Sequence, residues 1–143
     1  MENKQWTMMI LILLVATELV LTGFLSYKAA TSVAGFCVIG NDVGNCESVQ
    51  NSEYGKIFGI KLGYIGLFSF LVLSVALARD FRRKKLSRLF VVLTLIGFLF
   101  ALYLIYLQIF VLKQICTACI VVDGIAIAIF FVSMTAFRKA PLV

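Results

Sequence analysis

The stretch LFVVLTLIGFLFALYLIYLQIFVL, residues 89–112, contains no charged side chain. A helix needs about 20 predominantly apolar residues to cross the hydrocarbon core of a bilayer, so this stretch is long enough for one membrane span. Three other apolar runs of comparable length lie at residues 7–27, 62–78 and 115–137. The sequence therefore predicts an all-α membrane protein, a bundle of four transmembrane helices.

We expect these helices to cover about 7–28, 60–78, 89–111 and 115–137, within a single transmembrane domain that spans residues 1–143. Hydrophobic residues make up 62% of the sequence, whereas soluble domains have roughly 45–50%. The connections between the apolar runs are too short for a second folded unit. Any soluble partner is therefore expected to be a separate protein.

The net charge of +6 comes mainly from basic residues at the ends of the apolar runs. This placement is typical of membrane topology, because cytoplasmic connections carry an excess of lysine and arginine. It predicts contact with membrane lipid and no binding of nucleic acid. The most basic segment is RDFRRKKLSR at 79–88. Lys4 precedes the first apolar run, and Arg138 and Lys139 follow the last one. Both termini are therefore predicted to be cytoplasmic, and connections 30–58 and 112–115 extracytoplasmic.

The first apolar run has an alternative interpretation as a cleaved signal peptide. The apolar core of a signal peptide has roughly 7–15 residues, whereas this run is longer and contains Glu18. We therefore favour a membrane helix, and in either case the long connection after it lies outside the cytoplasm.

All four cysteines fall on the predicted outer side: Cys37, Cys46, Cys116 and Cys119. Disulfides persist outside the cytoplasm and are rare within it, so this placement favours thiol–disulfide chemistry. Cys116 and Cys119 form a Cys-x-x-Cys motif at the predicted start of the last helix, where residues at i and i+3 share one face. The amino terminus of a helix stabilises a thiolate. This pair is therefore a candidate redox centre at the membrane surface.

The other two cysteines end the segment CVIGNDVGNC, residues 37–46, which is rich in residues that favour turns. A relay between two redox pairs is the favoured interpretation. Two inert disulfides are one alternative. A zinc site built from four thiolates is another, but the spacing is not that of a zinc ribbon, and the sequence has no histidine. We predict no metal.

The order of these motifs resembles the vitamin K epoxide reductase family, in its prokaryotic single-domain form without a fused thioredoxin domain. The resemblance covers the spaced pair Cys37 and Cys46, Ser52 within NSEYGKIFGIKLGYIG, and CTAC at 116–119. A DsbB-type quinone-linked oxidase also has four helices and two cysteine pairs. Its Cys-x-x-Cys lies in the first outer loop, whereas here it comes last, so the order favours the first family.

The resemblance implies a quinone-dependent thiol–disulfide oxidoreductase in the cell membrane, with its cysteines on the extracytoplasmic side. It implies that Cys37 meets the thiols of a separate thioredoxin-fold, DsbA-like partner and that Cys46 passes electrons to Cys116. It also implies that Cys119 faces a quinone of the ubiquinone or menaquinone type, and that Ser52 supports the site. A non-catalytic membrane protein with structural disulfides is the alternative from a different class.

Asp123 occupies the position where the vitamin K-reducing enzymes of this family carry a tyrosine, and this departure counts against vitamin K epoxide as the substrate. Asp123 shares one helical face with Cys116 and Cys119. A carboxylate inside a membrane helix is a functional candidate by default. One hypothesis is that Asp123 moves protons during quinone reduction; the alternative is a hydrogen bond to a neighbouring helix. For Glu18, an interhelical hydrogen bond that anchors the bundle is favoured over a functional role.

Other residues are candidates for the quinone site. Gly59, Gly63 and Gly66 recur at helical spacing, which favours close helix packing, or leaves room for a flat ring. Tyr103, Tyr106 and Phe110 share a face near the outer end of the third helix, where they are candidates to wall the same cavity or to lie at the interface. Residues 47–58 are expected to form either a short surface helix over the cavity or a disordered segment.

Overall fold

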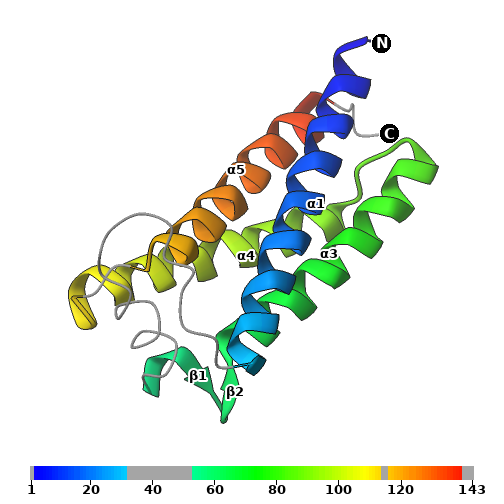
Figure 1. Ribbon diagram of the computed structural model, residues 1–143. Helices are drawn as coiled ribbons and strands as arrows, with labels where there is room; N and C mark the ends of the chain where they lie inside the picture. Colours follow the sequence, from blue (N-terminus) through cyan, green and yellow to red (C-terminus); the bar gives the residue numbers. More distant parts are fainter. Residues whose placement is uncertain (1, 32–52, 114–115, 140–143) are drawn as a thin grey trace.

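The computed structural model describes residues 2–31, 53–113 and 116–139 of the chain (Figure 1). Its four long helices are α1 (Glu2–Thr31), α3 (Leu62–Arg83), α4 (Arg88–Tyr106) and α5 (Thr117–Lys139). A π-helical segment, η2 (Leu107–Val111), continues α4. All four helices are long and apolar enough to cross a membrane. The prediction of a four-helix transmembrane bundle is confirmed.

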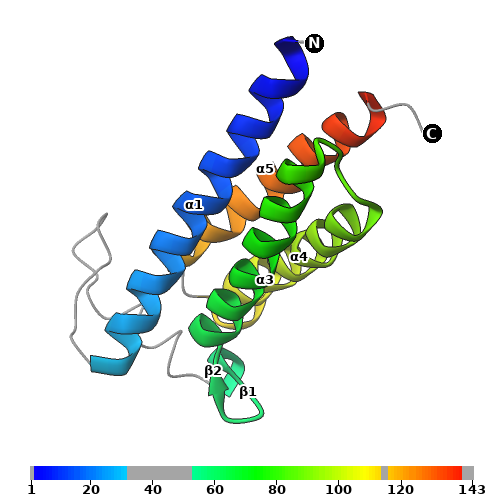
Figure 2. The same ribbon diagram turned by 90° about the vertical axis from the view of Figure 1, so that its right-hand side faces the viewer.

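The helices pack in a specific order around the bundle. Helix α1 lies against both α3 and α5, and α4 lies against α5 (Figures 1 and 2). The second helix extends beyond the expected 60–78 and ends at Arg83, because the basic residues of this segment continue its last turns. The long connection predicted between the first two helices includes residues 32–52, which lie outside the described part of the chain.

A short hairpin precedes α3. A 3-10 turn, η1 (Glu53–Gly55), leads into strands β1 (Lys56–Ile57) and β2 (Ile60–Lys61), which pair antiparallel. Phe58 and Gly59, between the strands, both have positive φ angles, as a two-residue hairpin turn requires. The prediction of a short surface helix over 47–58 is wrong for residues 56–58, which form strand β1 and the hairpin turn, whereas residues 53–55 form a single 3-10 turn. Residues 47–52 lie outside the described part.

The turn between α3 and α4 is fixed by two side chains. The buried carboxylate of Asp80 accepts a hydrogen bond from the backbone N–H of Ser87 at 2.7 Å. The hydroxyl of Ser87 in turn accepts from the N–H of Phe90 at 3.2 Å, which caps the first turn of α4. This turn lies at the same end of the bundle as the start of α1 and the end of α5 (Figure 2).

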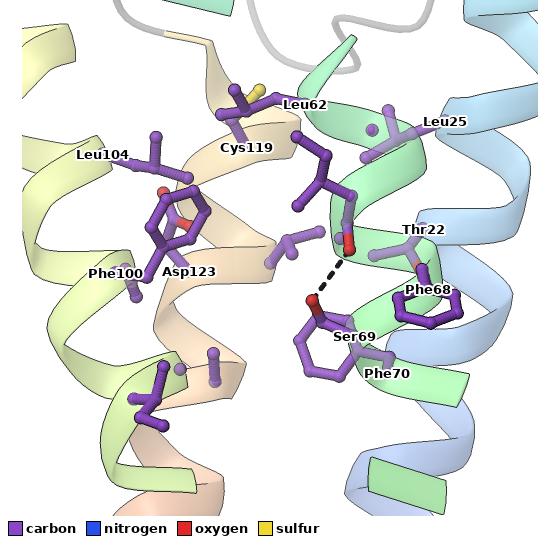
Figure 3. A pocket seen from close by; sticks show the side chains of 18 of the residues that line it. Thr22, Leu25, Leu62, Phe68, Ser69, Phe70, Phe100, Leu104, Cys119 and Asp123 are labelled. Carbon is purple, nitrogen blue, oxygen red and sulfur yellow. Dashed lines mark hydrogen bonds between the residues drawn. The ribbon is translucent and has the colours of Figure 1, made fainter. Parts of the chain in front are cut away.

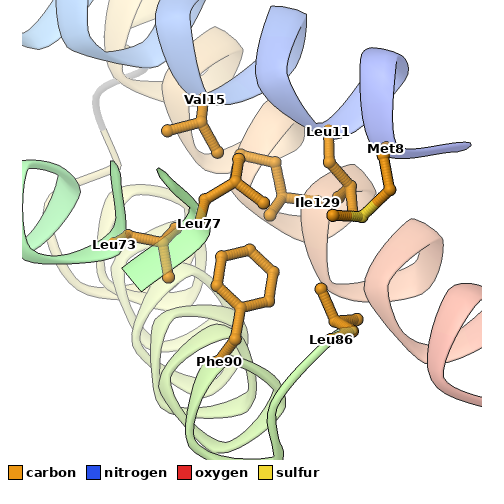
Figure 4. Packing of buried hydrophobic residues seen from close by; sticks show 8 residues of the cluster. All are labelled: Met8, Leu11, Val15, Leu73, Leu77, Leu86, Phe90 and Ile129. Atoms are coloured by element: carbon orange, nitrogen blue, oxygen red, sulfur yellow. The ribbon is translucent and has the colours of Figure 1, made fainter. Parts of the chain in front are cut away.

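The hydrophobic core fills this same end of the bundle (Figure 4). Its residues come from all four long helices and from the turn before α4: Met8, Leu11, Val15, Leu73, Leu77, Leu86, Phe90 and Ile129. A hydrogen bond of 3.0 Å between the buried hydroxyls of Thr94 and Ser133 joins α4 to α5. Because the core occupies one end, the other end has room for a cavity.

Candidate redox site beside an apolar cavity

Cys116 and Cys119 form a disulfide where α5 begins. Their Cα atoms are 5.3 Å apart, within the ~4.4–6.8 Å window for disulfides. The carbonyl of Cys116 accepts the first hydrogen bond of the helix from Ile120, and the N–H of Cys119 donates to Sγ of Cys116 at 3.4 Å. The amino terminus of α5 therefore directs the backbone N–H of Cys119 at the sulfur of Cys116, an arrangement that stabilises a thiolate.

The side chain of Gln108 holds the start of α5 in place. Its Oε1 accepts a hydrogen bond from the backbone N–H of Cys116 at 3.1 Å, and Gln108 is only 4% exposed. It lies in the π-helical segment η2, and such segments are frequent at functional sites. Sequence reasoning missed Gln108, although it is the sole amide side chain in the apolar run 89–112.

A cavity of about 530 Å³ lies between the four helices, next to Cys119 (Figure 3). In Figure 3, Cys119 and Asp123 lie on successive turns of α5, with Phe100 and Leu104 of α4 on one side and Thr22 of α1 on the other. Most of the lining is apolar, and a few polar groups converge on it. This combination of size and lining is typical of sites for small organic ligands. The polar or reactive lining side chains include Thr22, Ser69, Thr94, Gln108, Cys119 and Asp123.

The hydrophobic core closes one end of the cavity. Leu73 and Ile129 belong both to the hydrophobic core and to the cavity lining, so the core forms its floor. Tyr54 and Gly55 of η1 line it near the hairpin.

Two of the cavity's apolar lining residues also reach the outer surface of the bundle. Phe68 of α3 is 69% exposed and Ile96 of α4 is 58% exposed. Helices α3 and α4 also contact each other less than the other neighbouring helix pairs do. We infer from both observations that the cavity opens sideways between α3 and α4, toward the surface that faces lipid.

The sequence-predicted site residues divide into three groups. Cys119, Asp123 and Gly63 line the cavity, whereas Cys116 is fully buried beside it. Cys37, Cys46 and Ser52 lie outside the described residues, so their positions stay predictions.

Tyr103, Tyr106 and Phe110 do not form the cavity wall for which the sequence made them candidates. All three side chains are more than half exposed, none lines the cavity, and Tyr106 stacks on Phe110 at 5.1 Å. They share a helical face, as expected, but that face is turned outward. Phe100 and Leu104, on the adjoining face of α4, line the cavity instead, and the ring of Phe100 lies 6.4 Å from that of Tyr103.

The glycines before and within α3 have different surroundings. A Cβ atom at Gly63 would lie 3.5 Å from Oγ of Ser26, and one at Gly66 would lie 3.9 Å from Thr22. Ser26 also donates a hydrogen bond to the carbonyl of Gly63 at 3.0 Å. Gly63 and Gly66 therefore allow α3 to pack closely on α1 and also line the cavity, whereas Gly59 lies in the hairpin turn.

Two buried carboxyl groups lie beside this site. Asp123 is 5% exposed and Glu18 is 0% exposed. Within the described part of the chain, both oxygens of Glu18 and Oδ2 of Asp123 lack a hydrogen-bond partner. The interhelical hydrogen bond favoured for Glu18 is therefore not formed by the described residues, since no donor reaches its side chain.

The fold and the site together define a multi-pass membrane protein with a cysteine pair that forms a disulfide at the wall of an apolar cavity. Residues 6–134 match the vitamin K epoxide reductase family, and the chain belongs to this family. It is thus a membrane thiol–disulfide oxidoreductase. The resemblance inferred from the order of the cysteine motifs is confirmed.

Proposed function

We propose that this protein oxidises a thioredoxin-fold protein outside the cytoplasm and passes the electrons through two cysteine pairs to a quinone. In this relay Cys37 meets the partner's thiols, Cys46 reduces the Cys116–Cys119 disulfide, and Cys119 faces the quinone. The observation that carries the proposal is the position of Cys119, which is half of a disulfide and also part of the cavity wall.

The cavity fits a quinone by its size and its lining. A quinone accepts two electrons and two protons when bound, and becomes a quinol. Its flat ring suits an apolar space of about 530 Å³ with Phe100 on one side. The side chain of Gln108 lines the cavity, and its amide N–H groups would donate to an oxygen of the ring.

The sideways opening between α3 and α4 supports a lipid-soluble ligand. Phe68 and Ile96 line the opening and are more than half exposed. A ligand with a hydrocarbon tail can enter there from the bilayer without crossing the charged ends of the helices. The chemistry of the opening therefore favours a quinone over a water-soluble acceptor.

The burial of Cys116 supports an internal electron relay. Its side chain is fully buried, so a thiol dissolved in water does not reach its sulfur. Thiol–disulfide exchange requires direct attack of a thiolate on one sulfur of the disulfide. An internal cysteine is the better candidate for this attack, and Cys46 is the one that the family resemblance assigns.

The test uses the purified protein, a reduced thioredoxin-fold partner and a short-chain ubiquinone or menaquinone. We expect quinol to form, as followed by absorbance, and Cys119→Ser to abolish it. A partner that keeps only one of its two cysteines should be trapped in a mixed disulfide with Cys37, because its thiolate attacks the Cys37–Cys46 disulfide, releases the thiol of Cys46 and has no second thiol to complete the exchange. A non-reducing gel detects this product.

A matched control replaces Ser74 by alanine; its hydroxyl donates to the carbonyl of Leu71 within α3 and does not line the cavity. Ser74→Ala should keep the activity. If the four cysteines only staple the protein, their replacement will lower the free energy of unfolding while no trapped partner and no quinol appear, and the proposal is then wrong.

A further inference from the structure

Glu18 and Asp123 lie on two helices that pack together, α1 and α5. Both side chains are buried within the bundle. Three buried oxygens of the two groups have no hydrogen-bond partner among the described residues. Asp123 lines the cavity, as does Thr22 one turn after Glu18, whereas Glu18 itself does not line it.

No cation of the described residues lies at the depth of these two groups. Thr22 lies against Gly66, so Glu18, one turn before Thr22, lies near the level of Phe70 on the antiparallel α3. Arg79 and Lys61 each lie roughly 13 Å from this level along α3, at a rise of 1.5 Å per residue, and Lys61 lines the cavity near the hairpin. The other titratable residues on the packed helices lie near helix ends or are exposed: Glu2, Lys4, Tyr27, Lys28, Tyr64, Asp80, Arg82, Arg83, Arg88, Tyr103, Tyr106, Arg138 and Lys139.

Two unpartnered carboxylates in such surroundings oppose each other's ionisation. A charged side chain inside the bilayer is costly, and a like charge nearby disfavours the charged form further. Without a cation to compensate them, the two groups are stable together only while they retain a proton. We propose that Glu18 and Asp123 form a proton-exchanging pair, in which Asp123 exchanges a proton with the cavity and Glu18 shares the proton behind it.

The pair would serve the redox reaction, so this inference rests on the proposed function. Formation of the Cys116–Cys119 bond from two thiols breaks two S–H bonds and releases two electrons and two protons. Both electrons go to the quinone, whose two oxygens take up two protons. As a carboxylate Asp123 takes a proton from a thiol, and as an acid it donates a proton to a quinone oxygen. After one turnover the pair therefore holds as many protons as before. Histidine, the usual proton carrier, is absent from the sequence.

The first test reads the carboxyl groups themselves. Infrared difference spectra between the dithiol and disulfide states of the full-length protein in lipid nanodiscs should contain a carbonyl stretching band of a protonated carboxyl group that shifts in D₂O. We expect Asp123→Asn to remove this band and Glu18→Gln to shift it. Glu53→Gln, at an exposed carboxyl group in η1, should leave it unchanged. If the band is absent, or if neither Asp123→Asn nor Glu18→Gln changes it, the proposal is wrong.

The second test separates proton exchange from electron transfer. With short-chain ubiquinone, Asp123→Asn should lower the rate of quinol formation by about 10²-fold, the lower end of the range for loss of a general acid. The dependence of this rate on pH should also become flatter. Thiol–disulfide exchange with the partner should continue, because it does not use the pair. Wild-type rates and pH profiles in both Asp123→Asn and Glu18→Gln would refute the pair while leaving the cysteine relay intact.

Failure of the wild-type protein to reduce quinone would refute the proposed function instead. The infrared band of the wild-type protein stays informative even then, because it needs only the dithiol and disulfide states. Asparagine and glutamine match the shapes of the acids they replace, and thermal unfolding checks that both variants fold.

Discussion

Gln108 connects the end of one helix to the start of the next through a single hydrogen bond. Its Oε1 accepts from the N–H of Cys116, a group that the first turn of α5 cannot satisfy by itself. The bond fixes the backbone of the cysteine that the relay must reduce. Gln108 is therefore a positioning residue, because it touches the backbone of Cys116 and not its sulfur.

Gln108→Leu should weaken both the fold and the redox centre. The substitution keeps the approximate volume but leaves the N–H of Cys116 buried without an acceptor, which costs about 1–3 kcal/mol. We expect the free energy of unfolding to fall by that amount and the Cys116–Cys119 disulfide to re-form more slowly after reduction. Chemical denaturation and alkylation of free thiols over time measure the two effects.

The matched control is Ile109→Ala, one residue further along the same π-helical segment, where the side chain is exposed. It removes apolar surface without touching Cys116 and should leave the rate of disulfide formation unchanged. Equal reoxidation rates in Gln108→Leu and the wild-type protein would contradict a positioning role.

The chemistry-bearing residues differ in how far the sequence predicts them. Cys119 and Asp123 were predicted to share a helical face because that needs only the period of one helix, and both line the cavity. Gln108 depends on how the η2 segment meets α5, which no local pattern encodes. The full burial of Glu18 likewise depends on the packing of α1 against α5.

At the level of the helices, the sequence predicts each apolar run but not which side of it faces inward. Helix α4 is apolar almost all around, so its periodicity does not distinguish a lipid-facing side from a cavity-facing side. The sequence therefore makes Tyr103, Tyr106 and Phe110 candidates for the cavity wall only because they are aromatic and share a face. The aromatic residue of α4 that lines the cavity is Phe100. Packing against α5 decides the orientation.

Filling the cavity from α4 should block the quinone while leaving the fold intact. A Cβ atom added at Gly97 meets no atom within 4 Å, and Gly97 lines the cavity. Gly97→Phe should weaken quinone binding by about tenfold or more, a loss of ~1.4 kcal/mol per factor of ten. Titration of quinone binding measures the loss, and gel-based assays should show that disulfide exchange with the partner continues.

Gly124→Phe provides the control, because Gly124 also has open space around a Cβ atom but does not line the cavity. Neither glycine has a positive φ angle, so neither substitution strains the backbone. Equal quinone affinity in both variants would show that the quinone binds elsewhere.

For the whole molecule, the distribution of charge indicates how the bundle lies in the membrane. Nine of the thirteen lysines and arginines lie at the end of the bundle with the turn between α3 and α4: Lys4, Arg79, Arg82, Arg83, Lys84, Lys85, Arg88, Arg138 and Lys139. The opposite end, with the hairpin and η2, carries the other four: Lys28, Lys56, Lys61 and Lys113. By the positive-inside rule we expect the basic turn to face the cytoplasm, which would place the disulfide of α5 outside.

Single cysteines introduced into a variant without native cysteines test this orientation. Phe58→Cys lies at the fully exposed tip of the hairpin, and Lys84→Cys lies in the basic turn. In intact cells a membrane-impermeant maleimide should label the first variant and not the second. Both should be labelled after permeabilisation, which controls for reactivity. The reverse pattern would invert the topology and place the relay on the cytoplasmic side.

The sideways opening of the cavity also affects how the reaction should be measured. A ligand that enters between α3 and α4 arrives from the bilayer, so the amount that matters is its mole fraction among the lipids rather than its concentration in the buffer. Adding lipid at constant total quinone should therefore slow the reaction by dilution within the membrane, whereas adding buffer should not. Rates from different preparations become comparable only when the quinone-to-lipid ratio is held constant.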